Sequence, residues 1–139
     1  MIHKGRRVLL ALLLLSAVFG LSACSQNHSA DYEKAIDLFS KGDYAEAAQT
    51  FEKLGDYAQA QTYAAYSQGL VFYDQGQYSA AEPYFAKARD FMYGEQRYQF
   101  CHAVALEENG SYAEAAKAFE ALGDFENASL HYQYCRACA

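Results

Sequence analysis

The sequence repeats every 34 residues, and this repeat constrains the possible fold more than any other feature of the chain. Segments 42–51, 76–85 and 110–119 align without a gap, and Gly, Tyr, Ala and Phe recur at four identical positions. An aromatic residue also recurs between these segments, as Tyr57, Phe91 and Phe125. A repeat of this length is one supersecondary unit, which buries its apolar face only by stacking on its neighbours.

Each unit is predicted to be a pair of helices. The glycine that opens each aligned segment ends one helix, because glycine adopts a left-handed backbone conformation without a Cβ clash. Tyr, Ala and Phe then follow at helical spacing, so the small alanine lets the helices approach and the Phe fills the space one turn later. We expect Leu54-Gly55-Asp56 and Leu122-Gly123-Asp124 to stop the second helix and to offer Asp as the N-cap of the next. The predicted helices cover 31–41, 44–54, 57–75, 78–90, 93–109, 112–122 and 125–138.

A helix–turn–helix unit with a period of about 34 residues resembles the tetratricopeptide repeat. Ala35, Gly69 and Ala103 match the small residue in the first helix of that family's unit, and Ala47, Phe51 and Leu54 match its second helix. The resemblance covers residues 31–138 and implies an all-α, right-handed solenoid of about three helix-turn-helix repeats plus a closing helix. It also implies a concave groove that binds a protein or peptide.

Residues 1–23 are typical of a secretory signal. Lys4, Arg6 and Arg7 precede an apolar run over residues 8–21, which is short of the roughly 20 residues that a transmembrane helix needs. The run ends in Leu21-Ser22-Ala23-Cys24, which resembles the lipobox of bacterial lipoproteins. The resemblance implies cleavage before Cys24 and acylation of Cys24 with chains such as palmitate. Residues 24–30 then form a short linker to the predicted repeat domain over 31–139. The alternative is an ordinary signal or N-terminal anchor that contains an incidental cysteine.

The charge of the chain bears on how it would reach a membrane. Cleavage before Cys24 removes three basic residues and no acidic ones, which takes the net charge from −6 to −9. A chain this acidic has no electrostatic attraction for nucleic acid, and anionic lipid repels it. We therefore expect the acyl chains to hold the protein on the extracytoplasmic side of the cell membrane or the outer membrane.

No catalytic motif is present in the sequence. It contains no glycine-rich phosphate loop, no serine nucleophile elbow and no His-Glu-x-x-His zinc motif. The acidic pair Glu107-Glu108 precedes a predicted helix end, where a solvated face explains it. We therefore expect no enzymatic activity and no cofactor.

Three cysteines remain besides Cys24. Cys101 and Cys135 occupy the same repeat position, so we expect their Cα atoms about 9–11 Å apart, too far for a disulfide. Both are then small buried hydrophobes. His131, Cys135 and Cys138 share one helix face at the spacing of metal ligands, although no fourth ligand is evident. The sequence leaves open a free pair, a Cys135–Cys138 disulfide, or a small-molecule or metal-binding lipoprotein.

Rows of aromatic residues are the candidate binding surface. One face of the predicted helix 57–75 carries three tyrosines, and the helix 93–109 repeats that face. Most such residues are core between repeats, and the others line the groove. The predicted partner-binding set is Tyr63, Tyr66, Tyr73, Asp74, Arg97, Phe100, His131 and Tyr134, with polar specificity from Asp74, Arg97 and His131.

The last predicted helix, 125–138, is rich in apolar residues and poor in charge. One face packs on the preceding helix, and an exposed apolar remainder generally marks an interaction surface. We expect this helix to dock a partner or a second copy, the alternative being that its tyrosines cap the solenoid with their hydroxyls in water. Taken together, the sequence predicts a membrane-anchored, non-enzymatic scaffold that binds an envelope or secreted protein. The rival prediction is a structural assembly subunit that self-associates.

Overall fold

A computed structural model describes residues 27–139 of the chain, so the predictions for residues 1–23 and for Cys24 lie outside the described residues. The described part is all helical and contains no strand. A first helix over 27–41 is followed by α2 (Tyr44–Lys53), α3 (Ala60–Asp74), α4 (Tyr78–Lys87), α5 (Gly94–Glu108), α6 (Tyr112–Leu122) and α7 (Ala128–Cys138).

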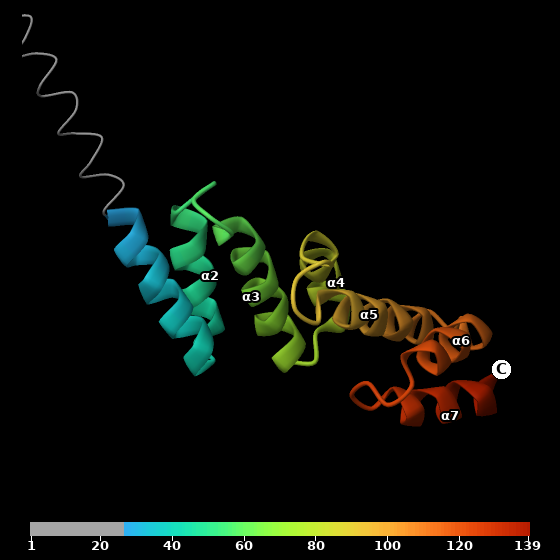
Figure 1. Cartoon of the computed structure of the whole chain (residues 1–139). Coiled ribbons are helices and arrows are strands. Elements are labelled where there is room, and N and C mark those ends of the chain that lie inside the picture. The colour runs from blue at the N-terminus through green and yellow to red at the C-terminus, as the bar shows by residue number, and fades with distance from the viewer. Residues whose placement is uncertain (1–26) are drawn as a thin grey trace, which may run out of the picture.

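The helices stack in sequence order, from the first helix at one end of the array to α7 at the other (Figure 1). Each helix from α2 to α7 packs mainly against its neighbours in the chain. This arrangement confirms the predicted α-solenoid. Within residues 27–139, no helix has both the length and the apolar character that crossing a membrane requires.

The hairpin core is built as the repeat predicts. The recurring Phe51, Phe85 and Phe119 are each fully buried, as are the alanines that precede them by one turn. Gly69 in α3 shows how close the helices come, because a Cβ there would lie 2.8 Å from the Phe85 ring. A contact this short leaves no room for a methyl group, so the small residue in the first helix sets the spacing of the hairpin.

The starts predicted for two helices were wrong. Helices α3 and α7 begin at residues 60 and 128, not at 57 and 125, whereas α5 begins at residue 94, within one residue of its prediction. The reason is a left-handed residue inside each of the two predicted starts, since φ is +50° at Ala58 and at Glu126; Met92, at the same repeat position, has φ +48° and lies just before α5. A helix cannot continue through such a residue. The two predicted Asp caps, Asp56 and Asp124, were also wrong, because Gln59 and Asn127 stand at the N-caps of α3 and α7 and neither makes a side-chain cap hydrogen bond.

The first helix includes part of the predicted linker. Residues 27–30 are already helical, although the prediction placed the helix start at residue 31. The ring of His28 lies 5.7 Å from the ring of Tyr57 in an edge-on contact, so this turn has a tertiary partner. Such a contact stabilises a helix end that local sequence signals alone do not specify.

Candidate interaction surface

The residues predicted to line one binding row do not share one environment. Tyr66 and Phe100 are 3% and 0% exposed, and Tyr73 is also buried. Tyr63, Arg97 and His131 are half-buried, whereas Asp74 and Tyr134 are exposed. The accessible part of the predicted row is therefore Tyr63, Asp74, Arg97, His131 and Tyr134.

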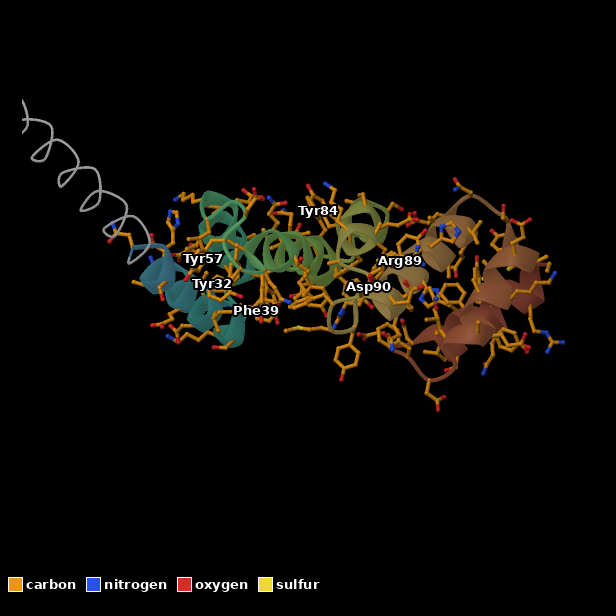
Figure 2. All side chains as sticks on the ribbon, turned by 45° about the horizontal axis from the view of Figure 1, so that its top comes forward. Tyr32, Phe39, Tyr57, Tyr84, Arg89 and Asp90 are labelled. Atoms are coloured by element: carbon orange, nitrogen blue, oxygen red, sulfur yellow. The ribbon has the colours of Figure 1, made fainter. Side chains whose placement is uncertain are left out.

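The loop aromatics explain why part of the row is buried. Phe91 lies in the loop after α4, and its ring centroid is 4.6 Å from that of Tyr63 and 5.4 Å from that of Tyr66. Phe125 covers Phe100 in the next unit at 6.2 Å. The first unit has a similar cluster, in which Tyr32, Phe39 and Tyr57 gather around the N-terminal hairpin (Figure 2). These side chains fill the space between units and turn most of the aromatic row into core.

Arg97 is held by contacts within the chain. Its guanidinium lies 4.7 Å from the centroid of the Tyr73 ring, and its Nε donates a hydrogen bond to the Tyr66 hydroxyl at 3.3 Å. Its Nη1 is 3.6 Å from Oε1 of Glu126, and the side chain is only 19% exposed. A cation this deeply placed needs such partners to offset its lost hydration. Arg97 thus ties α3 and α5 to the loop before α7.

Glu107, His131 and Cys135 form a polar cluster between α5 and α7. Nδ1 of His131 is 2.8 Å from Oε2 of Glu107, and the Cys135 thiol donates to the same oxygen at 3.3 Å. Burial and the neighbouring Glu107 carboxylate raise the pKa of Cys135 to about 11. Burial likewise raises the pKa of Cys101 to about 12. Both thiols are therefore protonated at neutral pH and are poor nucleophiles.

The structure separates the three α7 residues, His131, Cys135 and Cys138, that the sequence offered as alternative metal ligands. Cys135 is buried and Cys138 is exposed. His131 and Cys135 both turn to Glu107 of α5, a partner that the helix spacing alone did not indicate. Among residues 27–139, no three His, Cys, Asp or Glu side chains are grouped so that they could hold a metal ion. Cys101 and Cys135 are buried, as the sequence predicted for small hydrophobes.

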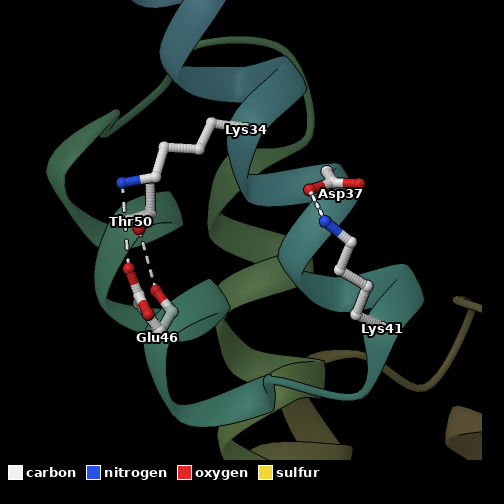
Figure 3. Close-up of polar contacts among 5 residues, drawn as sticks. All are labelled: Lys34, Asp37, Lys41, Glu46 and Thr50. Carbon is white, nitrogen blue, oxygen red and sulfur yellow. Dashed lines mark hydrogen bonds and ion pairs between the residues drawn. The ribbon is translucent and has the colours of Figure 1, made fainter.

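The surface of the first hairpin is occupied by ordinary polar pairs (Figure 3). Lys34 and Glu46 link the first helix to α2 at 3.7 Å, and Lys41 pairs with Asp37 one turn earlier. Thr50 donates its hydroxyl to the backbone carbonyl of Glu46 at 2.8 Å. Exposed pairs of this kind contribute about 0–1 kcal/mol each. These pairs lie on a solvated face of the first hairpin.

Large exposed apolar side chains lie at two places, on α7 and in the loop before α5. Leu130 and Tyr134 on α7 are 64% and 52% exposed, and Met92 and Tyr93 in the loop are 54% and 61% exposed. Leu130 and Tyr134, together with Glu107 and His131, line an open hollow of about 280 Å³. The predicted partner-binding set includes Tyr134 but not Leu130, which lies within the helix 125–138 that the sequence predicted to dock a partner. The sequence repeat marks Leu130 as an unusual surface residue, because the equivalent residues Thr62 and Gln96 are polar.

The comparisons with known proteins agree with the geometry. The family described as tetratricopeptide repeat matches residues 32–95 and again residues 66–129, so the two matches together span most of the chain. No curated protein and no solved structure matches the chain. The shift between the two matches, from residue 32 to residue 66, equals the shift from Gly42 to Gly76 in the sequence repeat. The chain therefore belongs to the tetratricopeptide repeat family.

Proposed function

We propose that this chain is a lipid-anchored, non-enzymatic scaffold of a bacterial cell envelope that binds a partner protein through its helical array. The observation that carries the proposal is the array itself, which matches the tetratricopeptide repeat over residues 32–129. Stacked helical repeats offer an extended surface to a partner, and the energy of binding is spread over many side chains. Function in such proteins depends on that surface more than on a reactive centre.

The lipid anchor is proposed from the sequence. Leu21-Ser22-Ala23-Cys24 resembles a lipobox, and the first helix is already present at residue 27. Each buried methylene of an acyl chain contributes about 0.8 kcal/mol, so two or three chains hold a protein durably on a bilayer. With Cys24 acylated, the first helix would lie beside the membrane, and α7 stands at the opposite end of the array (Figure 1).

The side chains of the described residues support binding over catalysis. The two buried thiols, Cys101 and Cys135, have raised pKa values and are not activated as nucleophiles. Glu107 is bonded to His131 and Cys135, both within the fold. What the array offers to a partner is the accessible part of the row, above all Tyr134 with Leu130 beside it.

Chemical crosslinking in the native membrane, followed by mass spectrometry of the captured proteins, tests this function. The wild-type chain should yield a reproducible partner, and Cys24→Ser should abolish incorporation of labelled palmitate and leave uncleaved precursor. Capture of no specific partner by the wild type would refute the scaffold. Palmitate incorporation into Cys24→Ser would refute the anchor independently of the scaffold.

A further inference from the structure

The helix α7 repeats a surface of α3 and α5 but leaves it uncovered. In register with the sequence repeat, each of the three helices presents an aromatic, a small residue and an apolar residue. These are Tyr66, Gly69 and Leu70 in α3, Phe100, Ala103 and Val104 in α5, and Tyr134, Ala137 and Cys138 in α7. All six in α3 and α5 are buried, whereas Tyr134 is 52% exposed and the other two in α7 are also exposed.

In α3 and α5 this surface is covered by the second helix of the same unit. The Phe85 ring of α4 lies 5.5 Å from that of Tyr66 and directly against Gly69. The Phe119 ring of α6 lies 5.8 Å from that of Phe100 in the same way. The covering helices share an aromatic, a small and an aromatic residue at i, i+3 and i+7, namely Tyr78, Ala81 and Phe85 in α4 and Tyr112, Ala115 and Phe119 in α6.

We propose that this face of α7 binds an amphipathic helix of a partner protein, and that this helix carries the pattern aromatic-x-x-Ala-x-x-x-Phe of α4 and α6. The inference rests on the proposed scaffold function and adds the place and chemistry of the contact. The interface continues the one that the solenoid already uses twice. The partner's Phe lies over Ala137 and between Tyr134 and Cys138, as Phe85 lies over Gly69.

The surroundings of α7 fit such a helix. One hollow of about 280 Å³ flanks Tyr134 on the side of Leu130 and Glu107. A second hollow of about 300 Å³ lies between Cys138 and the start of α6 at Tyr112. The hollow beside Leu130 is the one that an incoming helix borders, because the hollow at Tyr112 has an open counterpart at Tyr44 even though α4 covers α3. Of the described helices, α6 is the main neighbour of α7; its Tyr112 ring lies 6.0 Å from that of Tyr134, which remains 52% exposed.

A peptide taken from the chain itself serves as the probe. Residues 110–125 contain α6 and the following loop, so they carry the proposed pattern. A fluorescent peptide of this sequence is titrated with the full-length lipidated chain in nanodiscs, with empty nanodiscs as the blank, and its anisotropy is measured. We expect saturable binding that is at least about tenfold weaker when the peptide carries Phe119→Asp, because a buried aromatic anchor is lost.

The matched variants of the chain are Ala137→Leu and Ala86→Leu. Both alanines are exposed, but Ala137 lies on the proposed face of α7, whereas Ala86 lies on α4, which does not pack against α7. Ala137→Leu fills the place of the incoming Phe and should weaken the peptide at least about tenfold, whereas Ala86→Leu should leave its affinity unchanged. Equal binding of the two peptides, or full affinity in Ala137→Leu, would overturn the inference.

Three further results distinguish this inference from the function on which it rests and from a second copy as the occupant. A partner captured in native membranes by a chain that does not bind the peptide would overturn the α7 contact and leave the scaffold standing. A chain that dimerises through α7 and excludes the peptide would overturn the inference in favour of a second copy as the occupant. Specific peptide binding without any captured partner would support the contact and count against the scaffold function.

Discussion

The contact between Gly69 and Phe85 predicts that Gly69→Ala lowers the free energy of unfolding of the wild-type chain but raises that of a Phe85→Leu variant. In Gly69→Ala the new Cβ meets Cε1 of Phe85 at 2.8 Å and Cδ1 and Cζ at 3.0 Å. The ring cannot move aside easily, because it is fully buried between Tyr66 and Tyr73 at 5.5 and 5.8 Å. Overpacking of this kind costs about 1–3 kcal/mol, while replacing an interior helical Gly by Ala gains about 1 kcal/mol. The net loss of unfolding free energy is therefore about 0–2 kcal/mol.

The same substitution should stabilise the chain when the ring is shortened. In a Phe85→Leu background the Cε1 and Cζ contacts are gone, so Gly69→Ala should add up to about 1 kcal/mol to the free energy of unfolding through helix propensity. Urea unfolding of the four variants, followed by far-ultraviolet circular dichroism, measures the coupling. Ala103→Gly, at the same repeat position of α5, is the control and should destabilise by about 1 kcal/mol or more. An identical effect of Gly69→Ala in both backgrounds would refute the packing described for the hairpin.

Three other predictions follow from single positions. Ser67 has a fully buried hydroxyl without a hydrogen-bond partner in the described structure, and it occupies the repeat position of Cys101 and Cys135. Ser67→Cys should therefore raise the thermal midpoint, because it removes a penalty of about 1–3 kcal/mol for the unsatisfied hydroxyl. Iodoacetamide should modify exposed Cys138 at pH 8, whereas Cys101 and Cys135, with pKa values of about 12 and 11, should react only on unfolding or at high pH, as peptide mass mapping would show. Met92→Gly should increase the urea midpoint, because φ is +48° there and a non-glycine residue in that conformation costs about 1–2 kcal/mol; an unchanged or lower midpoint would contradict this.

The hairpin core was predictable from sequence because the period supplies three aligned examples of each position. Phe51, Phe85 and Phe119 recur at one position, and all three are buried. The starts of α3 and α7 were not predictable in the same way. Ala58 and Glu126 carry no residue signature of a left-handed backbone, which the packing of the loop imposes.

The candidate site was predictable only in part. Helical spacing put Tyr66, Phe100 and Tyr134 on equivalent faces, but it could not show which of them another helix covers. Coverage depends on tertiary neighbours such as Phe91 and Phe125, which pack over the first two. The polar cluster around Glu107 also joins two helices, so spacing within one helix could not reveal it.

The central claim is that the array is an interaction scaffold, and a photo-crosslinker at Tyr134 in native membranes tests it most directly. Tyr134 is 52% exposed on α7, and Gln49, exposed on α2, provides the control position. The account predicts a discrete crosslinked species from Tyr134 that is absent from Gln49 and is lost when Ala137→Leu is introduced. Crosslinks of equal pattern from both positions, or no discrete species from Tyr134, would contradict the claim.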